Sequence, residues 1–372
     1  MTKKILLLSA YDTSSHHYWR DQLANMFSAY EWTQRALPAR HFSWRIRGNS
    51  LSWGFDEADS FREDYDLLIA TSMVDLSSLR GFIPKLATLP TLVYFHENQF
   101  AYPMGTVSNK NAEQQLVPIY SALCADAICF NSNYNRTTFL EGARSLFKQL
   151  PDLVPKNLSS HLEASTVLPV PIDVPDKNER VSAADHLSVV WNHRWEYDKG
   201  PGILLEIIRQ IAKEELPIRF HILGEQFRQW PAEFDQIQEL LESHCQRTGL
   251  AAGHFGFIDN KEQYFACLQQ SDVVLSTALH EFQGVAMQEA ILCGCTPLAP
   301  ARLVYPEYLE PQFLFPAAET AEAEAAAADI LRTWLELRRS GTTLPQADLQ
   351  SYSSNNLQDR YAALFARLLQ GR

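Results

Sequence analysis

Short apolar runs alternate with longer segments of helical periodicity along the 372-residue chain. Such runs suit buried parallel strands, and helical spacing of apolar residues indicates amphipathic helices. The predicted strands cover 5–8, 42–47, 66–72, 91–95, 127–130, 167–171, 187–192, 218–223, 254–258, 273–275 and 296–299. The predicted helices cover 18–30, 134–150, 202–213, 233–247, 261–268, 284–292, 319–339 and 356–369. This alternation predicts an α/β fold with parallel sheets.

Two series of these units are joined by a proline-rich stretch, and we place the linker between them near 170–186. A chain of 372 residues also exceeds one ordinary domain. We therefore expect two facing Rossmann-like domains, with a last helix that crosses back onto the first. The predicted boundaries are 1–172 for the first domain, 187–345 for the second, and 346–372 for the returning segment.

The composition narrows the class of protein. A net charge of −12 argues against a broad electrostatic footprint for nucleic acid, although a local basic groove stays open. The six cysteines form no C-x-x-C pair, which favours reduced thiols over disulfides or zinc ligands. The first apolar run is too short for a signal peptide, and no segment reaches transmembrane length. We expect a cytoplasmic protein without a membrane partner. The D-x-D at Asp64–Asp66 precedes its strand, so we expect no metal site there.

The most informative stretch is 272–300, which reads as strand, loop, helix and strand. Glu281 stands before the helix, and Glu289 lies about 12 Å further along it at a rise of ~1.5 Å per residue. Glycine at 284 allows close approach of a ligand. Free N–H groups at the helix start form an anion site, and they belong to Phe282, Gln283, Gly284 and Val285. Such a site suits a ligand with hydroxyls, phosphates and a ribose diol in series. The alternative is one acid stabilising the helix dipole and one unrelated surface acid.

Two cations follow the first strand of the second domain. Arg194 and Lys199 are five positions apart in a loop at the carboxyl end of strand 187–192. A guanidinium and an ammonium in that place can neutralise a diphosphate. The alternative is a pair of surface cations.

The first domain offers three further candidates. Ser14 and Ser15 are small residues after the first strand, where phosphate or sugar could approach the backbone, or they could simply cap the next helix. His96 directly follows strand 91–95 and would face the ligand crevice, unless it is a structural histidine. Trp44, Arg45 and Arg47 interleave aromatic and cationic groups, as a single-stranded RNA loop requires, but a half-buried strand with solvated arginines would look the same.

These motifs resemble a known family. Arg194-x4-Lys199 with Glu281-x7-Glu289 on two Rossmann-like halves resembles the retaining GT-B glycosyltransferases of family 4. Longer stretches resemble the tRNA-queuosine mannosyltransferase family, namely SSHHYWRDQL, LPARHFSWRIRG, YFHENQFAYP, FNSNYN, NHRWEYDKGP and GVAMQEAILCGCTPLAPARLVYPE. One departure is that Ser14-Ser15 replaces the first-domain glycine pair of many family 4 enzymes.

The resemblance implies transfer of mannose from GDP-mannose to queuosine at the wobble position of the tRNA(Asp) anticodon, with retention and without metal or cofactor. Arg194, Lys199 and the helix amides would stabilise the leaving diphosphate. Glu281 would bind the sugar, Glu289 the ribose, and His96 the sugar and reacting centre. Phe257 and Ile258 would hold the base. The residues implied for the acceptor are His16, His17, Trp44, Arg45, Arg47, Asn98 and Gln99.

Two other functions stay open at this point. A family 4 enzyme could use another nucleotide sugar and a small molecule, lipid or polysaccharide as acceptor. The first helix lacks the basic face that a lipid acceptor would favour. A non-catalytic nucleotide-sugar binding module is the third possibility, and the intact set of Arg194, Lys199, Glu281 and Glu289 argues against it.

Overall fold

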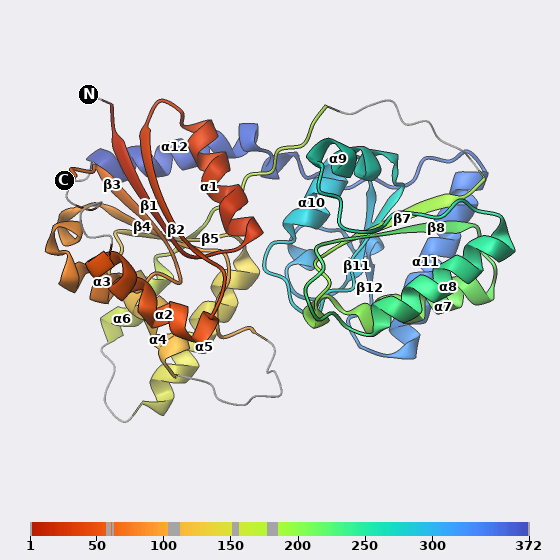
Figure 1. Ribbon diagram of the computed structural model, residues 1–372, viewed down its shortest axis with the longest axis horizontal. Coiled ribbons are helices and arrows are strands. Elements are labelled where there is room, and N and C mark those ends of the chain that lie inside the picture. The colour runs from red at the N-terminus through yellow and green to blue at the C-terminus, as the bar shows by residue number, and fades with distance from the viewer. Residues whose placement is uncertain are drawn as a thin grey trace. The chain divides into compact units, whose positions relative to one another are not determined.

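The computed structural model describes residues 2–56, 61, 63–102, 112–150, 156–176 and 185–370. The chain forms two compact units (Figure 1). Unit 1 contains Met1–Pro171 and Tyr352–Arg372, and unit 2 contains Ile172–Ser351. Each unit has a parallel six-stranded sheet with helices, which confirms the predicted α/β class. Within the described part of the chain, no helix is both long and apolar enough to cross a membrane.

The sheet of unit 1 has the order β2-β1-β3-β4-β5-β6. Its strands are β1 (Lys4–Asp12), β2 (Glu31–Pro38), β3 (Leu67–Thr71), β4 (Thr91–Phe95), β5 (Ala127–Phe130) and β6 (Thr166–Val167). The order reverses between β1 and β3, and open parallel sheets bind ligands beyond the carboxyl ends of their strands at such a reversal. Strands β3 and β4 are buried along their whole length, which explains their uninterrupted apolar sequence.

The helices of unit 1 are α1 (Ser14–Met26), α2 (Phe42–Leu51), α3 (Leu76–Phe82), α4 (Ala112–Leu123), α5 (Asn133–Gln149), α6 (Lys156–Glu163) and α12 (Ser354–Gln370). A π-helical turn at Ser52–Asp56 continues α2, and a 3-10 turn at Pro84–Thr88 follows α3. The last helix therefore belongs to unit 1, where it lies beside α1 (Figure 1).

The predicted strand at 42–47 is wrong, because these residues begin helix α2. The alternation of Phe42, Trp44 and Ile46 with polar residues imitates the period of a strand. The strand at the edge of the sheet, beside β1, is β2. Its residues are mostly part-exposed, with Leu37 alone buried among Glu31–Pro38. An edge strand has one unpaired side and needs no continuous apolar run. The hydrophobic pattern therefore did not predict a strand at these residues.

Helix α12 completes the core of unit 1 through aromatic and polar contacts. The indole nitrogen of Trp19 donates to the hydroxyl of Tyr361 at 3.1 Å, and that hydroxyl donates to the carbonyl of Pro169 at 2.9 Å. The ring of Tyr94 stacks on Trp19 with centroids 4.2 Å apart. The two ends of the chain are therefore parts of one buried cluster.

The sheet of unit 2 has the order β12-β11-β10-β7-β8-β9. Its strands are β7 (Leu187–Asn192), β8 (Ile218–Leu223), β9 (Phe255–Gly256), β10 (Val273–Leu275), β11 (Thr296–Pro300) and β12 (Leu314–Phe315). Its helices are α7 (Pro201–Lys213), α8 (Glu233–Thr248), α9 (Lys261–Gln270), α10 (Val285–Leu292) and α11 (Ala321–Arg339). Short 3-10 turns lie at Tyr197–Lys199, Tyr305–Glu307, Pro311–Phe313 and, across the boundary between the units, Gln350–Tyr352. The reversal point lies between β7 and β10, which pair directly.

Candidate active site

The loops that leave β7 and β10 are tied together at the reversal point of unit 2. The carbonyl oxygen of Asp198 accepts hydrogen bonds from the amides of Leu279 at 2.8 Å and His280 at 3.1 Å. The hydroxyl of Thr277 donates to the carbonyl of Lys199 at 2.8 Å. The two motifs that the sequence singled out therefore form one structure, although about 80 residues separate them.

Gly200 allows this close approach. Its φ of 66° is in the left-handed region, and a Cβ atom there would overlap the carbonyl oxygen of Thr277. Any other residue would meet both backbone strain and a steric clash. The loop that carries Lys199 consequently depends on glycine at this position.

Lys199, which is buried, forms an ion pair with the part-exposed Glu281. The Lys199 ammonium lies 2.9 Å from the carbonyl of His280, 3.2 Å from the Asp198 carboxylate and 3.3 Å from the Glu281 carboxylate. Burial lowers the pKa of Lys199, but Glu281 and Asp198 outweigh it and hold that pKa above its ordinary value. Burial likewise raises the pKa of Glu281, whereas Lys199, His193 and His280 lower it to about 2. Both groups stay charged at neutral pH.

Arg194 is in electrostatic range of this pair and forms an ion pair of its own with Glu196. Its guanidinium lies 2.9 Å from the Glu196 carboxylate, and its side chain is 40% exposed. Its charge is close enough to lower the pKa of Lys199, against the larger effect of the acids. Unit 2 thus places two cations in one neighbourhood, one buried and one at the surface.

The start of α10 differs in one respect from the prediction. The amide of Phe282 was expected to be free for an anion, but it donates to the Glu281 carboxylate at 3.1 Å. Gln283 is buried, and its side-chain amide donates to Gln288 at 2.9 Å. Gly284 precedes Val285 with a φ of 78°, as the N-cap of the helix. The backbone at 283–285 remains the candidate anion site.

Glu289 lies in the second turn of α10, where its carboxylate accepts a hydrogen bond from the Tyr264 hydroxyl at 3.0 Å. Burial raises the pKa of Glu289 to about 7, and the hydrogen bond from Tyr264 opposes that rise. Phe257 follows β9 and is 57% exposed, and Ile258 beside it is half-buried. Both lie beyond the carboxyl end of their strand, as a base-binding role requires.

In unit 1, two of the three predicted histidines lie together. His16 on α1 and His96 after β4 are buried, and their rings stack with centroids 4.1 Å apart. Burial lowers the pKa of both, that of His16 to about 4, so both rings are neutral near pH 7. Neither nitrogen of His16, nor Nε2 of His96, has a hydrogen-bond partner within the described residues. Buried polar atoms of this kind are expected to meet a ligand or water.

Ser14, Ser15 and His17 are exposed on the first turns of α1. The alternative that a serine caps this helix is wrong, because Thr13 occupies the N-cap position. His17 approaches Asp21 at 3.3 Å and Asp12 at 3.6 Å. These side chains are available at the carboxyl edge of the unit 1 sheet.

Asn98 and Gln99 differ in their surroundings. The amide of Asn98 is buried and donates to Asn135 and Thr138, while its oxygen accepts from the amide of Phe100. Asn98 therefore holds the loop after β4 in place. Gln99 is half-buried, and its side-chain nitrogen has no hydrogen-bond partner among the described residues. Only Gln99 of the two keeps an open donor for a ligand.

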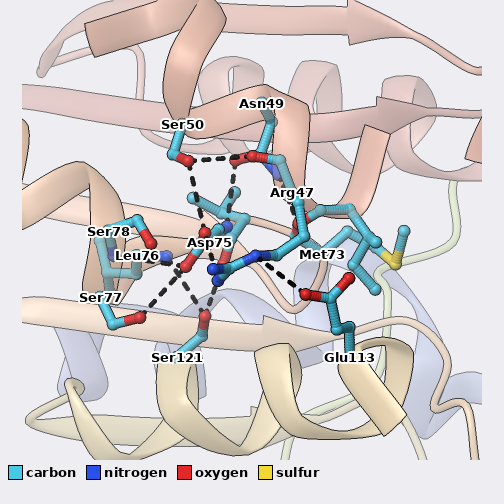
Figure 2. A network of polar contacts seen from close by, with 12 residues as sticks. Arg47, Asn49, Ser50, Met73, Asp75, Leu76, Ser77, Ser78, Glu113 and Ser121 are labelled. Atoms are coloured by element: carbon cyan, nitrogen blue, oxygen red, sulfur yellow. Dashed lines mark hydrogen bonds and ion pairs between the residues drawn. The ribbon is translucent and has the colours of Figure 1, made fainter. Parts of the chain in front are cut away.

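Arg47 contributes to a polar network that joins α2 to the loop after β3 (Figure 2). Its guanidinium lies 2.9 Å from the carboxylate of Asp75, which is 1% exposed. Asp75 also accepts from Ser50, and its amide donates to Asn49 at 3.0 Å. The sequence did not suggest this ion pair, which fixes one end of the guanidinium, although the Arg47 side chain stays 48% exposed.

Trp44 and Arg45 are consecutive residues of α2 that differ in exposure. Arg45 is buried, whereas Trp44 is 57% exposed, with its indole over Gly48. Of the aromatic and cationic stretch, Trp44 is the member that presents an open ring.

Comparison of the sequence with known proteins shows the family to which the chain belongs. Residues 4–172 match the family model described as tRNA-queuosine alpha-mannosyltransferase N-terminal, and residues 176–342 match the model for glycosyl transferases group 1. A tRNA-queuosine alpha-mannosyltransferase of Drosophila melanogaster is 35% identical over 291 residues, which are 75% of this chain and 74% of that protein. The chain belongs to the tRNA-queuosine alpha-mannosyltransferase family. It is accordingly a glycosyltransferase.

Solved structures support the GT-B fold. Sucrose-phosphate synthase from Thermosynechococcus elongatus matches with a TM-score of 0.67 and 14% identity, covering 100% of both chains. HepE of Anabaena, solved in complex with UDP, matches with a TM-score of 0.59 and 15% identity, covering 98% of this chain and 100% of that one. At these identities the likeness shows the fold alone.

Three residues of the site were not predicted from the sequence of this family member. Asp198 stands beside Lys199 and could have been noted from its position. Thr277 and Tyr264 carry no motif, and their contacts depend on how β10 and α9 pack against the rest of unit 2. Such residues become visible only in three dimensions.

Proposed function

We propose that the protein transfers mannose, with retention, from GDP-mannose to the cyclopentenediol of queuosine in the anticodon loop of tRNA(Asp). The observation that carries the proposal is the charged Lys199–Glu281 pair at the reversal point of a family member's nucleotide-type sheet. A cytoplasmic location is part of the proposal, because the six free thiols suit a reducing compartment.

In this proposal, positively charged side chains of unit 2 stabilise the GDP that leaves the donor sugar. The bond between the sugar C1 and the diphosphate oxygen breaks, and negative charge grows on the leaving GDP. Lys199, kept charged by its acidic neighbours, and Arg194 at the surface stabilise that charge together with the amides at 283–285. We propose a reaction without a resident metal or cofactor, because these groups provide the positive charge.

Glu281 binds sugar hydroxyls in the proposal and does not act as nucleophile or base. Its pKa of about 2 makes it a weak proton acceptor, and one of its oxygens already accepts the Phe282 amide. The acceptor hydroxyl therefore attacks C1 from the face that GDP leaves, and its proton passes to the leaving phosphate oxygen. The new C1–O bond then has the configuration of the old one.

Unit 1 receives the acceptor in the proposal. The modified base must leave the stack of its loop to be reached, and exposed aromatic rings stabilise such splayed nucleotides. Trp44 presents an open ring, and the neutral His16–His96 pair holds buried nitrogens without partners among the described residues. These features support an RNA acceptor, as the name of the Drosophila relative describes for that protein.

The proposal predicts label transfer that depends on queuosine. GDP-mannose with a radiolabelled sugar is incubated with the protein and with tRNA from queuosine-containing or queuosine-lacking cells. We expect label only in the first pool, in tRNA(Asp). Label in both pools, or in neither, would contradict the proposed acceptor. GDP-sugars other than GDP-mannose serve as the donor control.

Trp44 and Arg47 are expected to behave differently. Trp44→Ala should leave the free energy of unfolding within about 0.5 kcal/mol of the original and weaken tRNA binding about tenfold through the lost stacking. Arg47→Ala should destabilise the protein by about 1 kcal/mol, since Asp75 loses a charged partner but keeps its other donors. Denaturant unfolding and filter binding measure the two effects. Tyr120, another exposed ring of unit 1, is the control, and equal losses of binding in Trp44→Ala and Tyr120→Ala would contradict a specific role.

A further inference from the structure

A chain of hydrogen bonds connects three elements of unit 2 at Glu289. The side-chain nitrogen of Asn192, at the end of β7, lies 2.8 Å from the carbonyl of Ala286 and 3.1 Å from the hydroxyl of Tyr264. Tyr264, on α9, lies 3.0 Å from the Glu289 carboxylate on α10. Asn192 is the first residue of the stretch NHRWEYDKGP, and Tyr264 lies outside all the stretches named for the resemblance.

The direction of these hydrogen bonds follows from their partners. A backbone carbonyl can only accept, so the Asn192 atom facing Ala286 must be the NH₂ group. That group then donates its second hydrogen to the oxygen of Tyr264. With its oxygen accepting from Asn192, Tyr264 directs its own hydrogen at Glu289. The Tyr264 hydroxyl, oriented by Asn192, thereby donates a hydrogen bond that fixes one oxygen of the Glu289 carboxylate.

The other carboxylate oxygen of Glu289 is open. Within residues 185–370, Tyr264 is the hydrogen-bond partner of this side chain. The titratable groups that face the pair are Lys261 on α9 and Cys293 on α10 itself. Strands β10 and β11, which also pack against α10, have no titratable residue. The arrangement leaves one acceptor oxygen of Glu289 for a ligand with hydroxyl donors, and the side chain carries a negative charge when it is deprotonated.

We propose that Tyr264 is a positioning residue of the donor site, which, supported by Asn192, orients the Glu289 carboxylate so that it accepts hydrogen bonds from the ribose hydroxyls of a nucleoside diphosphate. The inference rests on the proposed function for the presence of a nucleotide donor. It goes beyond that function by naming what holds the ribose-binding acid in place.

The arrangement has a consequence for pH. A carboxylate accepts from both ribose hydroxyls, whereas its protonated form gives up acceptor capacity. Because the pKa of Glu289 is about 7, nucleotide affinity should fall as the pH drops through that region. Removing the Tyr264 hydroxyl removes a hydrogen bond to the charged form, so the midpoint of this fall should move to higher pH.

The test compares two nucleotides on one variant. Isothermal titration calorimetry gives the affinities of GDP and of 2′,3′-dideoxy-GDP for the full-length protein and for Tyr264→Phe. We expect GDP to bind about tenfold more weakly to the variant, as the loss of a hydrogen bond to a charged group predicts. The dideoxy nucleotide should bind both proteins equally. The GDP affinity of the variant should also show its pH midpoint shifted upward.

Tyr305→Phe is the matched control, since Tyr305 is a buried tyrosine of the same unit whose hydroxyl contacts Ser276 instead of Glu289. Its ratio of GDP to dideoxy-GDP affinity should match that of the original protein. An equal loss for both nucleotides in Tyr264→Phe, or no loss, would overturn the inference. If the circular dichroism spectrum showed that Tyr264→Phe does not fold, Asn192→Ala would replace it, and its ratio of GDP to dideoxy-GDP affinity would be measured in the same way. If UDP bound in place of GDP, the proposed donor would fail, and the ribose comparison would proceed with UDP and its dideoxy form.

Discussion

Replacing Lys199 by alanine is expected to lower the rate of sugar transfer by at least about 10²-fold to 10³-fold, the loss seen when one preorganised charge stabiliser is removed. The ammonium is buried between Glu281 and Asp198, where its interactions are stronger than at a solvated surface. Without it, two acids would face the departing diphosphate. Radiolabel transfer at saturating GDP-mannose measures the effect on kcat.

Lys213→Ala is the control for this variant, because Lys213 is exposed at the end of α7 in the same unit. It should retain full activity. Glu281→Ala should also lower the transfer rate strongly, since the sugar hydroxyls lose their acceptor. Circular dichroism must show both site variants folded, because Lys199→Ala removes the cation beside Glu281, and Glu281→Ala leaves Lys199 with Asp198 as its acidic partner. Full activity in either variant would remove that residue from the proposed site.

Replacing Gly200 by alanine is expected to destabilise the protein by about 2–4 kcal/mol and to reduce transfer to the level of Lys199→Ala. The residue has a φ of 66°, and the new methyl group would meet the carbonyl of Thr277. Either the backbone of this loop or the end of β10 must move, and the Lys199–Glu281 pair would separate.

Gly202 offers a matched control for this substitution. It lies two positions further on, inside α7, and a Cβ atom there would meet no other atom within 4 Å. Gly202→Ala should therefore stabilise the helix by about 0.5–1 kcal/mol and leave transfer unchanged. Denaturant unfolding of both variants measures the contrast. A Gly200→Ala protein as stable and active as Gly202→Ala would show that the loop tolerates the substitution without the predicted strain.

Buried strands were readable from the sequence, whereas edge elements were not. Strand β7 has the predicted limits Leu187–Asn192, because residues buried on both faces form an uninterrupted apolar run. Strand β2 was missed, and α2 was taken for it, because an edge strand shares its composition with many loops and Phe42, Trp44 and Ile46 happen to alternate. The GT-B fold was predicted through motif resemblance and is confirmed by the solved structures.

Site residues could be predicted where charged side chains lie in a loop directly after a predicted strand. Lys199 and Glu281 were named from their positions after strands, and the structure brings them into contact. The partnership of Arg47 with Asp75 was not visible, because it depends on the packing of α2 against the loop after β3. Tyr264 was not visible either, since nothing in the sequence around it indicates that α9 lies behind Glu289.

Because α12 belongs to unit 1 but follows unit 2 in the sequence, it is synthesised only after the whole of unit 2. Unit 2 is complete by Ser351 and can fold during translation. The stacked rings of Trp19 and Tyr94 lack their contact with Tyr361 until α12 has been synthesised. A nascent chain stalled before Tyr352 would hold a finished second half and an unfinished first half with exposed aromatic surface. We expect chaperones that shield apolar surface to bind such a chain during elongation.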